Sequence, residues 1–499
     1  MAAVIVILLG LSPYSSAVTG PVTNETTKKI ERFVEEQMKA GKIPGSSVVI
    51  VEKGKTVYQQ SFGYADVRAK KPVNNDTLFE IGSTTKAFTA FAILQLEKEG
   101  LVNRNDDVRK YLPWLELTYN GEPQIITVNQ LLHHTSGINS DTITRIPESQ
   151  ADNAMELTVK TLLDQPLNRM PGSSFEYATI NYDVLGLIIE TVSKKSYERY
   201  MKEYILDPLG MKQSFVGAQQ THSTLMAAGY KIGFLKAHAY TPPVYRGNSP
   251  AGYLISSTND LGKWMNAQLG TATDRSVDQR LITESHIPDE SVEPLDVNTR
   301  YALGWGILQE NDKKYVLHAG SNPTYSSYFI MRPDTQVGVA VLANMKTSMT
   351  TSIGQGIMDL WEGNDAEEPP MDIYQKIDQY ATAACMVIVV LGCLFLWLSL
   401  TILKKLSRNQ RKWSPLTGKR IVLLIIHFLI ASGFMTFILM VPQLFLGGTP
   451  WSYIRVWAPS SIWMTLLCFL AVCVTYFSFG LVLTCTKKVN KGTGMDALK

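Results

Sequence analysis

The first 384 residues of this 499-residue chain contain no cysteine, because all five cysteines lie further on, at Cys385, Cys393, Cys468, Cys473 and Cys485. No disulfide can staple this long N-terminal part, which must fold on its own hydrophobic core. The net charge is only +3, too small an excess to neutralise nucleic-acid phosphates, which excludes a nucleic-acid partner. The sequence also lacks a phosphate loop, a dinucleotide fingerprint, His-Glu-x-x-His and Cys-x-x-Cys. We therefore expect neither cofactor nor metal.

Charged residues are missing from three long apolar runs near the C-terminus. These runs cover residues 380–403, 421–446 and 458–486 and are rich in Leu, Ile, Val and Phe. Each is longer than the ~20 residues that a helix needs to cross the hydrocarbon core of a bilayer. The sequence therefore predicts three transmembrane helices, with membrane lipid as a partner.

Acidic residues are missing from the loop between the first two runs. That loop is strongly basic, and three more lysines follow the third run (Lys404, Lys405, Arg408, Arg411, Lys412, Lys419 and Arg420 in the loop; Lys487, Lys488 and Lys491 in the tail). Since positive flanks stay cytoplasmic, everything before residue 380 is expected outside the membrane. A short apolar core at residues 3–11, followed by small residues, predicts a signal peptide over residues 1–17. Residues 18–362 then form an exported domain, and residues 363–379 form a linker.

The exported part has an α/β pattern. Residues 47–52 and 56–62 predict a hairpin, and residues 326–331 and 337–343 predict two further strands near the other end. Between about residues 100 and 235 the pattern is mostly helix and loop. We expect one sheet built from both ends of the domain, with a helical insertion between them.

The chemistry centres on Ser83-Thr84-Thr85-Lys86, at the start of a helix expected to run to Gly100. Residues three apart share a helix face, so the Ser83 hydroxyl should lie beside the Lys86 amine. A serine becomes a nucleophile when a neighbouring base takes its proton, and a lysine with a lowered pKa can be that base. Backbone N–H groups at a helix start can stabilise an oxyanion. Glu80, just before this motif, is interpreted as a structural carboxylate.

Two further motifs follow in order, the stretch Tyr177-Ala178-Thr179 and the stretch His318-Ala319-Gly320-Ser321. With them, residues 25–360 resemble the serine β-lactamase and penicillin-binding-protein-like hydrolases, close to the class C branch, whose nucleophile motif is Ser-x-x-Lys. The resemblance implies Ser83 as the acylated nucleophile and Lys86 and Tyr177 as proton-transfer partners. It places His318 where the family has its third-motif cation. It also implies an oxyanion hole from the backbone N–H groups of Ser83 and Ser321.

One position departs from the general family pattern, because Thr179 stands where Tyr-x-Asn has its asparagine. With Asn322-Pro323 and the three C-terminal spans, the chain resembles membrane-bound peptidases that remove an N-acyl-D-asparagine cap from nonribosomal peptide prodrugs, typified by the colibactin-maturation peptidase. That resemblance implies that Thr179 and Asn322 bind the D-Asn side chain. It makes Asn248 another wall of that pocket, although a histidine is expected there.

Three hypotheses remain open at this stage. The first is a prodrug-activating D-asparaginyl peptidase acting on an acylated peptide substrate. The second is a cell-wall D-alanyl carboxypeptidase, esterase or β-lactamase. The third is an acylated membrane sensor that needs a cytoplasmic partner. In each case we expect a multi-pass protein of a bacterial cytoplasmic membrane with its catalytic domain on the extracytoplasmic side. The pattern does not determine the oligomeric state.

Overall fold

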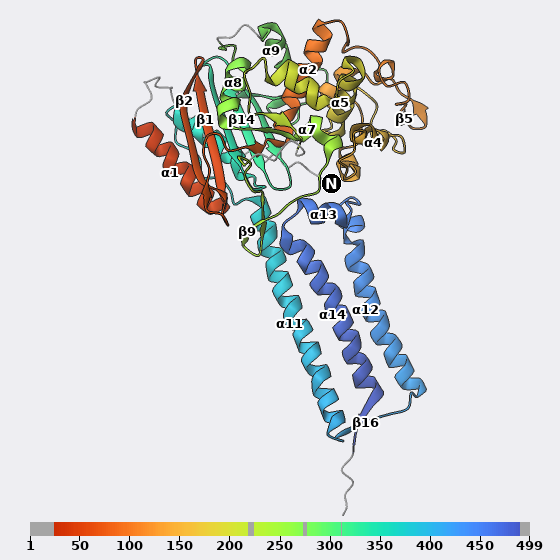
Figure 1. Ribbon diagram of the computed structural model, residues 1–499. Helices are drawn as coiled ribbons and strands as arrows, with labels where there is room; N and C mark the ends of the chain where they lie inside the picture. Colours follow the sequence, from red (N-terminus) through yellow and green to blue (C-terminus); the bar gives the residue numbers. More distant parts are fainter. Residues whose placement is uncertain (1–23, 218–223, 273–276, 311, 490–499) are drawn as a thin grey trace, which may run out of the picture. The chain divides into compact units, whose positions relative to one another are not determined.

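The computed structural model describes residues 24–217, 224–272, 277–310 and 312–489 (Figure 1). The expected signal peptide at residues 1–17 lies outside these residues. The described chain forms two compact units. One holds residues up to 232 together with 236–374, and the other holds residues 233–235 and everything from residue 375 onward. The first unit has the β-lactamase-like α/β fold and the second has three long apolar helices, so the predicted fold class is confirmed.

An eight-stranded antiparallel sheet is the centre of the first unit, and it is built from both ends of the domain. β1 lies between β15 and β2, where Val49 pairs with Ala340 and Gln59. The predicted hairpin and the two late strands are therefore all present. In sheet order, the strands are β11 (Thr299–Tyr301), β12 (Gly306–Glu310), β13 (Lys313–Ser321), β14 (Ser326–Arg332), β15 (Val337–Ala343), β1 (Gly45–Glu52), β2 (Lys55–Asp66) and β3 (Lys71–Pro72).

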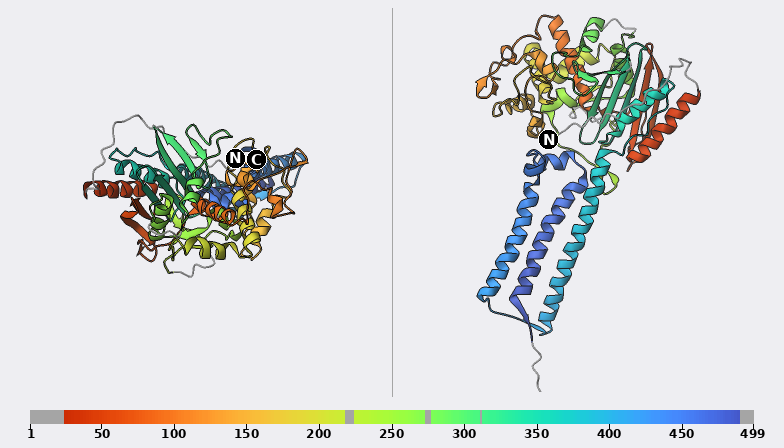
Figure 2. Two further views of the ribbon diagram at one scale, coloured as in Figure 1. Left: turned by 90° about the horizontal axis from the view of Figure 1, so that it is seen from above. Right: turned by 180° about the vertical axis from the view of Figure 1, so that it is seen from behind.

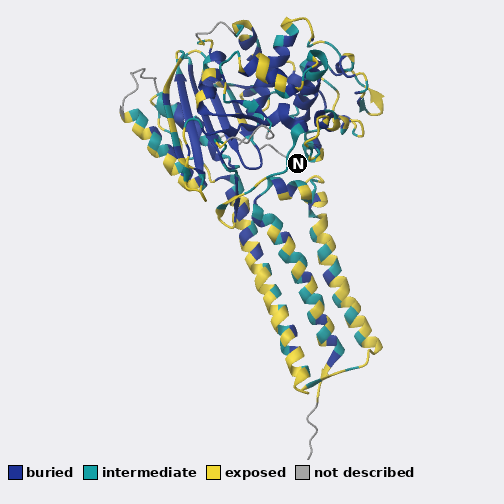
Figure 3. Ribbon diagram, viewed as in Figure 1, coloured by how far each residue is buried: buried dark blue, intermediate teal, exposed yellow. Residues whose placement is uncertain are grey.

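Both faces of this sheet are covered by helices, because its central strands are apolar on both sides (Figure 2). Val48 and Ile50 of β1 face α1 (Asn24–Gly41) and α10 (Met349–Trp361). Their neighbours Val49 and Val51 belong to the core on the other face, under α2 (Thr85–Lys98) and α8 (Thr258–Gln268). The strands are accordingly buried in Figure 3.

α2 is buried almost throughout and connects the sheet to the helical subdomain. Its Phe88 ring stacks on Trp264 of α8 with 3.9 Å between ring centroids. The other helices of this unit are α3 (Val128–Leu132), α4 (Ala154–Lys160), α5 (Ile180–Ser193), α6 (Tyr197–Tyr200), α7 (Ser249–Gly252) and α9 (Gln279–Ser285). A small sheet runs β4 (Phe79–Glu80), β10 (Leu254–Ser256), β7 (Phe215–Val216), and short hairpins pair β5 (Thr118–Tyr119) with β6 (Glu122–Pro123) and β8 (Tyr230–Gly233) with β9 (Lys236–Ala239).

The C-terminal helices are long and apolar enough to cross a membrane. They are α11 (Ile373–Ser407), α12 (Gly418–Phe445) and α14 (Ser460–Cys485), with the short α13 (Trp451–Trp457) between the last two. α11 begins before the predicted span, so residues 373–379 of the expected linker are helical. Within this unit the His427 ring lies 3.0 Å from the Tyr476 hydroxyl, and β16 (Arg411–Trp413) pairs with β17 (Thr486–Lys488).

Candidate active site

Ser83 stands in a short helical turn, Gly82–Thr84, that leads into α2. Gly82 has a φ of +57°, and a Cβ at this position would lie 2.4 Å from the backbone nitrogen of Ser321. Only glycine permits both this backbone conformation and this approach. The end of β13 is thereby held against the nucleophile turn, which is the arrangement needed if the backbone N–H groups of Ser83 and Ser321 are to share one oxyanion.

Lys86 lies one helical turn after Ser83, as the spacing predicts. Its Nζ is 3.3 Å from the Ser83 Oγ and donates to the carbonyl oxygen of Ala251 at 2.8 Å. Burial lowers the pKa of Lys86 to about 7, and the negative charge of Asp183 acts in the opposite direction. A neutral amine is therefore accessible near neutral pH, as a general base requires.

Tyr177 completes this group. Its phenol faces Ser83, and the Lys86 Nζ lies 5.1 Å from the centre of its ring. Burial raises the pKa of Tyr177, so the phenol keeps its proton at neutral pH and can pass it on. The ring packs on His134 with 4.3 Å between centroids, and the His134 Nδ1 lies 3.0 Å from the amide nitrogen of Asn181. His134 therefore packs against the Tyr177 ring and helps to hold it in place.

His318 of β13 occupies the third-motif position as a neutral ring. Burial, with a smaller contribution from Lys86, lowers its pKa to about 3. The Nδ1 lies 2.7 Å from the carbonyl oxygen of Ala319, an acceptor only, so this nitrogen carries the hydrogen. The Nε2 then accepts from the Tyr301 hydroxyl at 3.1 Å. Where the resemblance implies a cation, this site has a neutral hydrogen-bonding group.

The side chains of Asn322 and Glu80 are hydrogen-bonded to each other. The Asn322 amide nitrogen donates to a carboxyl oxygen of Glu80 at 2.6 Å and to the carbonyl oxygen of Gly252 at 2.9 Å. Both amide hydrogens are used in this way, so the Asn322 Oδ1 is the group left to accept from a ligand. Burial raises the pKa of Glu80 to about 7, while the Asn322 hydrogen bond lowers it.

The remaining predicted residues have different surroundings. Thr179 is the residue before α5 and is 7% exposed, and its hydroxyl has no hydrogen-bond partner among the described residues. The Ser321 hydroxyl lies beside the Tyr374 phenol, and this contact lowers the pKa of Tyr374 against the larger effect of burial. Asn248 differs from the expectation. With its amide oriented to satisfy its neighbours, its nitrogen donates to the two carboxyl oxygens of Asp183 at 3.0 and 2.9 Å. The Asn248 amide nitrogen is therefore already hydrogen-bonded within the protein.

Two residues at the centre have no role in the sequence analysis. Asp183 is fully buried, and burial raises its pKa well above the usual range of an aspartate, while the charge of Lys86 lowers it. The only available signal was its place on α5, six residues after Tyr177. Tyr301, which hydrogen-bonds to His318, lies outside the three sequence motifs. Among the described residues no group of His, Cys, Asp and Glu could hold a metal ion.

Comparison with known proteins shows the family of this chain. A family model described as Beta-lactamase matches residues 30–354. "Protein flp" of Staphylococcus aureus (strain MRSA252) is 31% identical over 455 residues, which cover 89% of this chain and 88% of that protein. "Putative penicillin-binding protein PbpX" of Bacillus subtilis (strain 168) is 36% identical over 210 residues, or 42% of this chain and 50% of that protein.

Two solved structures share the fold. The octameric penicillin-binding protein homologue from Pyrococcus abyssi superposes with a TM-score of 0.61 at 30% identity, covering 71% of this chain and 81% of that one. EstCE1, a hydrolase with promiscuous acyltransferase activity, gives a TM-score of 0.58 at 18% identity over 68% of this chain and 98% of that one, a likeness of fold alone. With Ser83, Lys86 and Tyr177 assembled as described, the chain belongs to the beta-lactamase family of serine hydrolases.

Proposed function

We propose that this protein is a membrane-anchored serine peptidase that removes an N-acyl-D-asparagine cap from a peptide natural product. The orientation of Asn322 is the observation that carries the proposal. Glu80 and Gly252 accept hydrogen bonds from both amide hydrogens of Asn322. These two bonds fix the orientation of the amide, so the Asn322 side-chain carbonyl oxygen can only accept a hydrogen bond, and from one direction. A primary amide on the substrate has the N–H groups to fill it, whereas an alanine methyl or an aspartate carboxylate has none.

Thr179 supports the same substrate. It stands two residues after Tyr177, and its hydroxyl has no partner among the described residues. A hydroxyl can donate to the carbonyl oxygen of a primary amide while Asn322 accepts from its nitrogen. A site that pairs both ends of an amide rejects analogues that leave these buried groups unpaired.

The reaction would proceed through an acyl-enzyme. The Ser83 Oγ attacks the carbonyl carbon of the D-asparagine residue, and its proton passes to the Lys86 Nζ, 3.3 Å away. As the C–N bond breaks, the Tyr177 phenol gives a proton to the leaving amine and regains one from Lys86. Water then attacks the Ser83 ester by the same proton path, and acyl-D-asparagine leaves. The C-terminal helices would anchor the enzyme, with the catalytic domain on the extracytoplasmic side.

Mass spectrometry of four substrates tests the proposal: acyl-D-Asn, acyl-L-Asn and acyl-D-Asp amides and a D-Ala-D-Ala peptide. Wild-type protein should release acyl-D-asparagine alone, and Ser83→Ala should release nothing. Cleavage of the D-Ala-D-Ala peptide with indifference to D-Asn would instead select a cell-wall enzyme. A stable mass increase on Ser83 without turnover would select a sensor.

A further inference from the structure

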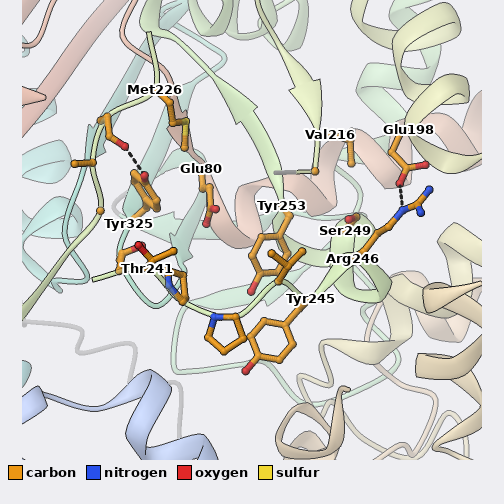
Figure 4. A pocket seen from close by; sticks show the side chains of 18 of the residues that line it. Glu80, Glu198, Val216, Met226, Thr241, Tyr245, Arg246, Ser249, Tyr253 and Tyr325 are labelled. Carbon is orange, nitrogen blue, oxygen red and sulfur yellow. Dashed lines mark hydrogen bonds and ion pairs between the residues drawn. The ribbon is translucent and has the colours of Figure 1, made fainter. Parts of the chain in front are cut away.

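A pocket of about 570 Å³ adjoins the site described above, and no step of the proposed reaction uses it (Figure 4). The segment that leads from β9 to α7 forms one side of the pocket. Its walls are mainly apolar and aromatic, and they include Val216, Met226, Tyr245, Tyr253 and Tyr325. This combination of apolar walls with few polar groups is typical of sites that take small organic ligands.

The chain connects this pocket to the catalytic base within three residues. The carbonyl oxygen of Ala251 accepts from Lys86, that of Gly252 accepts from Asn322, and Tyr253 lines the pocket. Three consecutive Cα atoms span at most about 7.6 Å. Gly252 leaves this junction open, because even a Cβ there would come within 3.4 Å of the Asn322 Oδ1. The backbone that holds Lys86 and Asn322 therefore continues directly into the wall of the pocket.

Glu80 belongs both to the wall of the pocket and to the site described above. It is 6% exposed, and in Figure 4 it lies between Tyr325 and Tyr253. Its carboxyl group holds the Asn322 amide, so one side chain is shared by the amide site and the pocket.

Two hydroxyls in the pocket wall have no partner. The Ser249 Oγ and the Thr324 Oγ1 belong to fully buried side chains and make no hydrogen bond within the described ranges. Unpaired buried hydroxyls are uncommon, because each costs about 1–3 kcal/mol. These two hydroxyls add no charge to the wall of the pocket, so they are compatible with an uncharged occupant.

We infer that this pocket holds the uncharged apolar acyl chain that precedes the scissile carbonyl of the substrate. The inference rests on the proposed function for the identity of that chain, which would be the N-acyl group on D-asparagine. The basic side chains in its wall are already paired with carboxylates: Arg246 with Glu198 at 3.0 Å, Arg199 with Glu203 at 2.6 Å and Lys202 with Asp207 at 2.9 Å. A chain without charge therefore fits the pocket along its length.

Ester hydrolysis by the full-length protein in lipid nanodiscs tests the pocket independently of D-asparagine. p-Nitrophenyl acetate, butyrate and hexanoate place acyl chains of increasing length on Ser83. Each buried methylene contributes enough to raise kcat/KM about fourfold, so butyrate, with two more methylenes, should exceed acetate by roughly 15-fold. Val244→Trp should fill the pocket from a half-buried position and bring this ratio close to one, whereas the matched Val244→Ala should keep it.

An equal butyrate-to-acetate ratio in wild type and Val244→Trp, with an unchanged melting temperature, would overturn the inference. A ratio near one in the wild type would do the same. The proposed function is judged separately by the acyl-D-Asn amide. Its failure there, with the chain-length preference intact, would retain the pocket as an acyl site and reject D-asparagine as the residue attached to it.

Discussion

The amine of Lys86 donates to the carbonyl oxygen of Ala251 at 2.8 Å, although the two residues are 165 positions apart. This contact holds the Lys86 nitrogen beside Ser83, and the surrounding protein excludes water from it. A buried ammonium is costly, and the pKa of Lys86 is accordingly lowered to about 7.

The pH dependence of acylation should follow Lys86. The neutral amine is the base, so kcat/KM for p-nitrophenyl acetate should rise with pH through about 7 and then level off. Stopped-flow measurement of p-nitrophenol release between pH 5 and 9 gives the curve. A rise centred near the ordinary lysine value of about 10.4 would contradict the assignment.

The charge of Asp183 should shift the pH at which kcat/KM rises. Its charge raises the pKa of Lys86 against the effect of burial. Asp183→Asn removes that charge, so the rising limb of kcat/KM should move to lower pH while the plateau keeps most of its height. Glu122→Gln, an exposed change on β6, serves as the control. An unmoved limb would mean that Asp183 carries no charge in the folded protein.

His318 should contribute no titration of its own. Its pKa is lowered to about 3, so the ring stays neutral throughout the working range. We expect His318→Gln, which keeps a polar group near Tyr301, to reduce kcat/KM and to leave the shape of the pH profile unchanged. Loss of a limb near the ordinary histidine value of about 6.5 would show that the wild-type ring is a cation after all.

Gly82→Ala should damage catalysis far more than its size suggests. The new Cβ would lie 2.4 Å from the Ser321 nitrogen, so the Ser83 turn and β13 must separate. Misplacement of reacting groups by about 1 Å can cost about 100-fold in rate. Gly100→Ala is the matched control, because Gly100 also has a positive φ, +75°, but nothing lies within 4 Å of its added Cβ. Equal esterase rates for the two variants would disprove this role of Gly82.

The expected topology can be checked with a single new cysteine. Every native cysteine lies in the C-terminal helices, and Val297 in the catalytic domain is 91% exposed. A membrane-impermeant maleimide should therefore label Val297→Cys on intact cells and leave the wild type unlabelled. Labelling only after the cells are permeabilised would place the domain on the cytoplasmic side.

Local patterns were enough to predict much of this molecule. The spacing of three residues places Lys86 beside Ser83, and short apolar runs bounded by turn residues predict β1, β14 and β15. Three uncharged runs predict α11, α12 and α14, although α11 starts earlier because residues 373–379 continue the helix.

Long-range pairings could not be predicted in this way. Asp183 acts on Lys86 across 97 positions of the sequence, and Asn248 turns its amide to Asp183 rather than into the site. Sequence spacing predicts neither of these pairings, because the packing of α2, α5 and α7 against one another determines which residues meet. The pocket beside Glu80 is likewise formed by segments distant in sequence.

The position of β1 between β2 and β15 has a consequence for biosynthesis. Val49 acquires its neighbour Ala340 only after almost 300 further residues have been made. In the proposed topology, the chain therefore crosses the membrane with its central strand open on one side, at risk of pairing with another chain. Sheet closure then waits for β15, and α11 begins only 30 residues after that strand ends. Completion of the enzyme and insertion of its first apolar helix thus become nearly simultaneous events in synthesis.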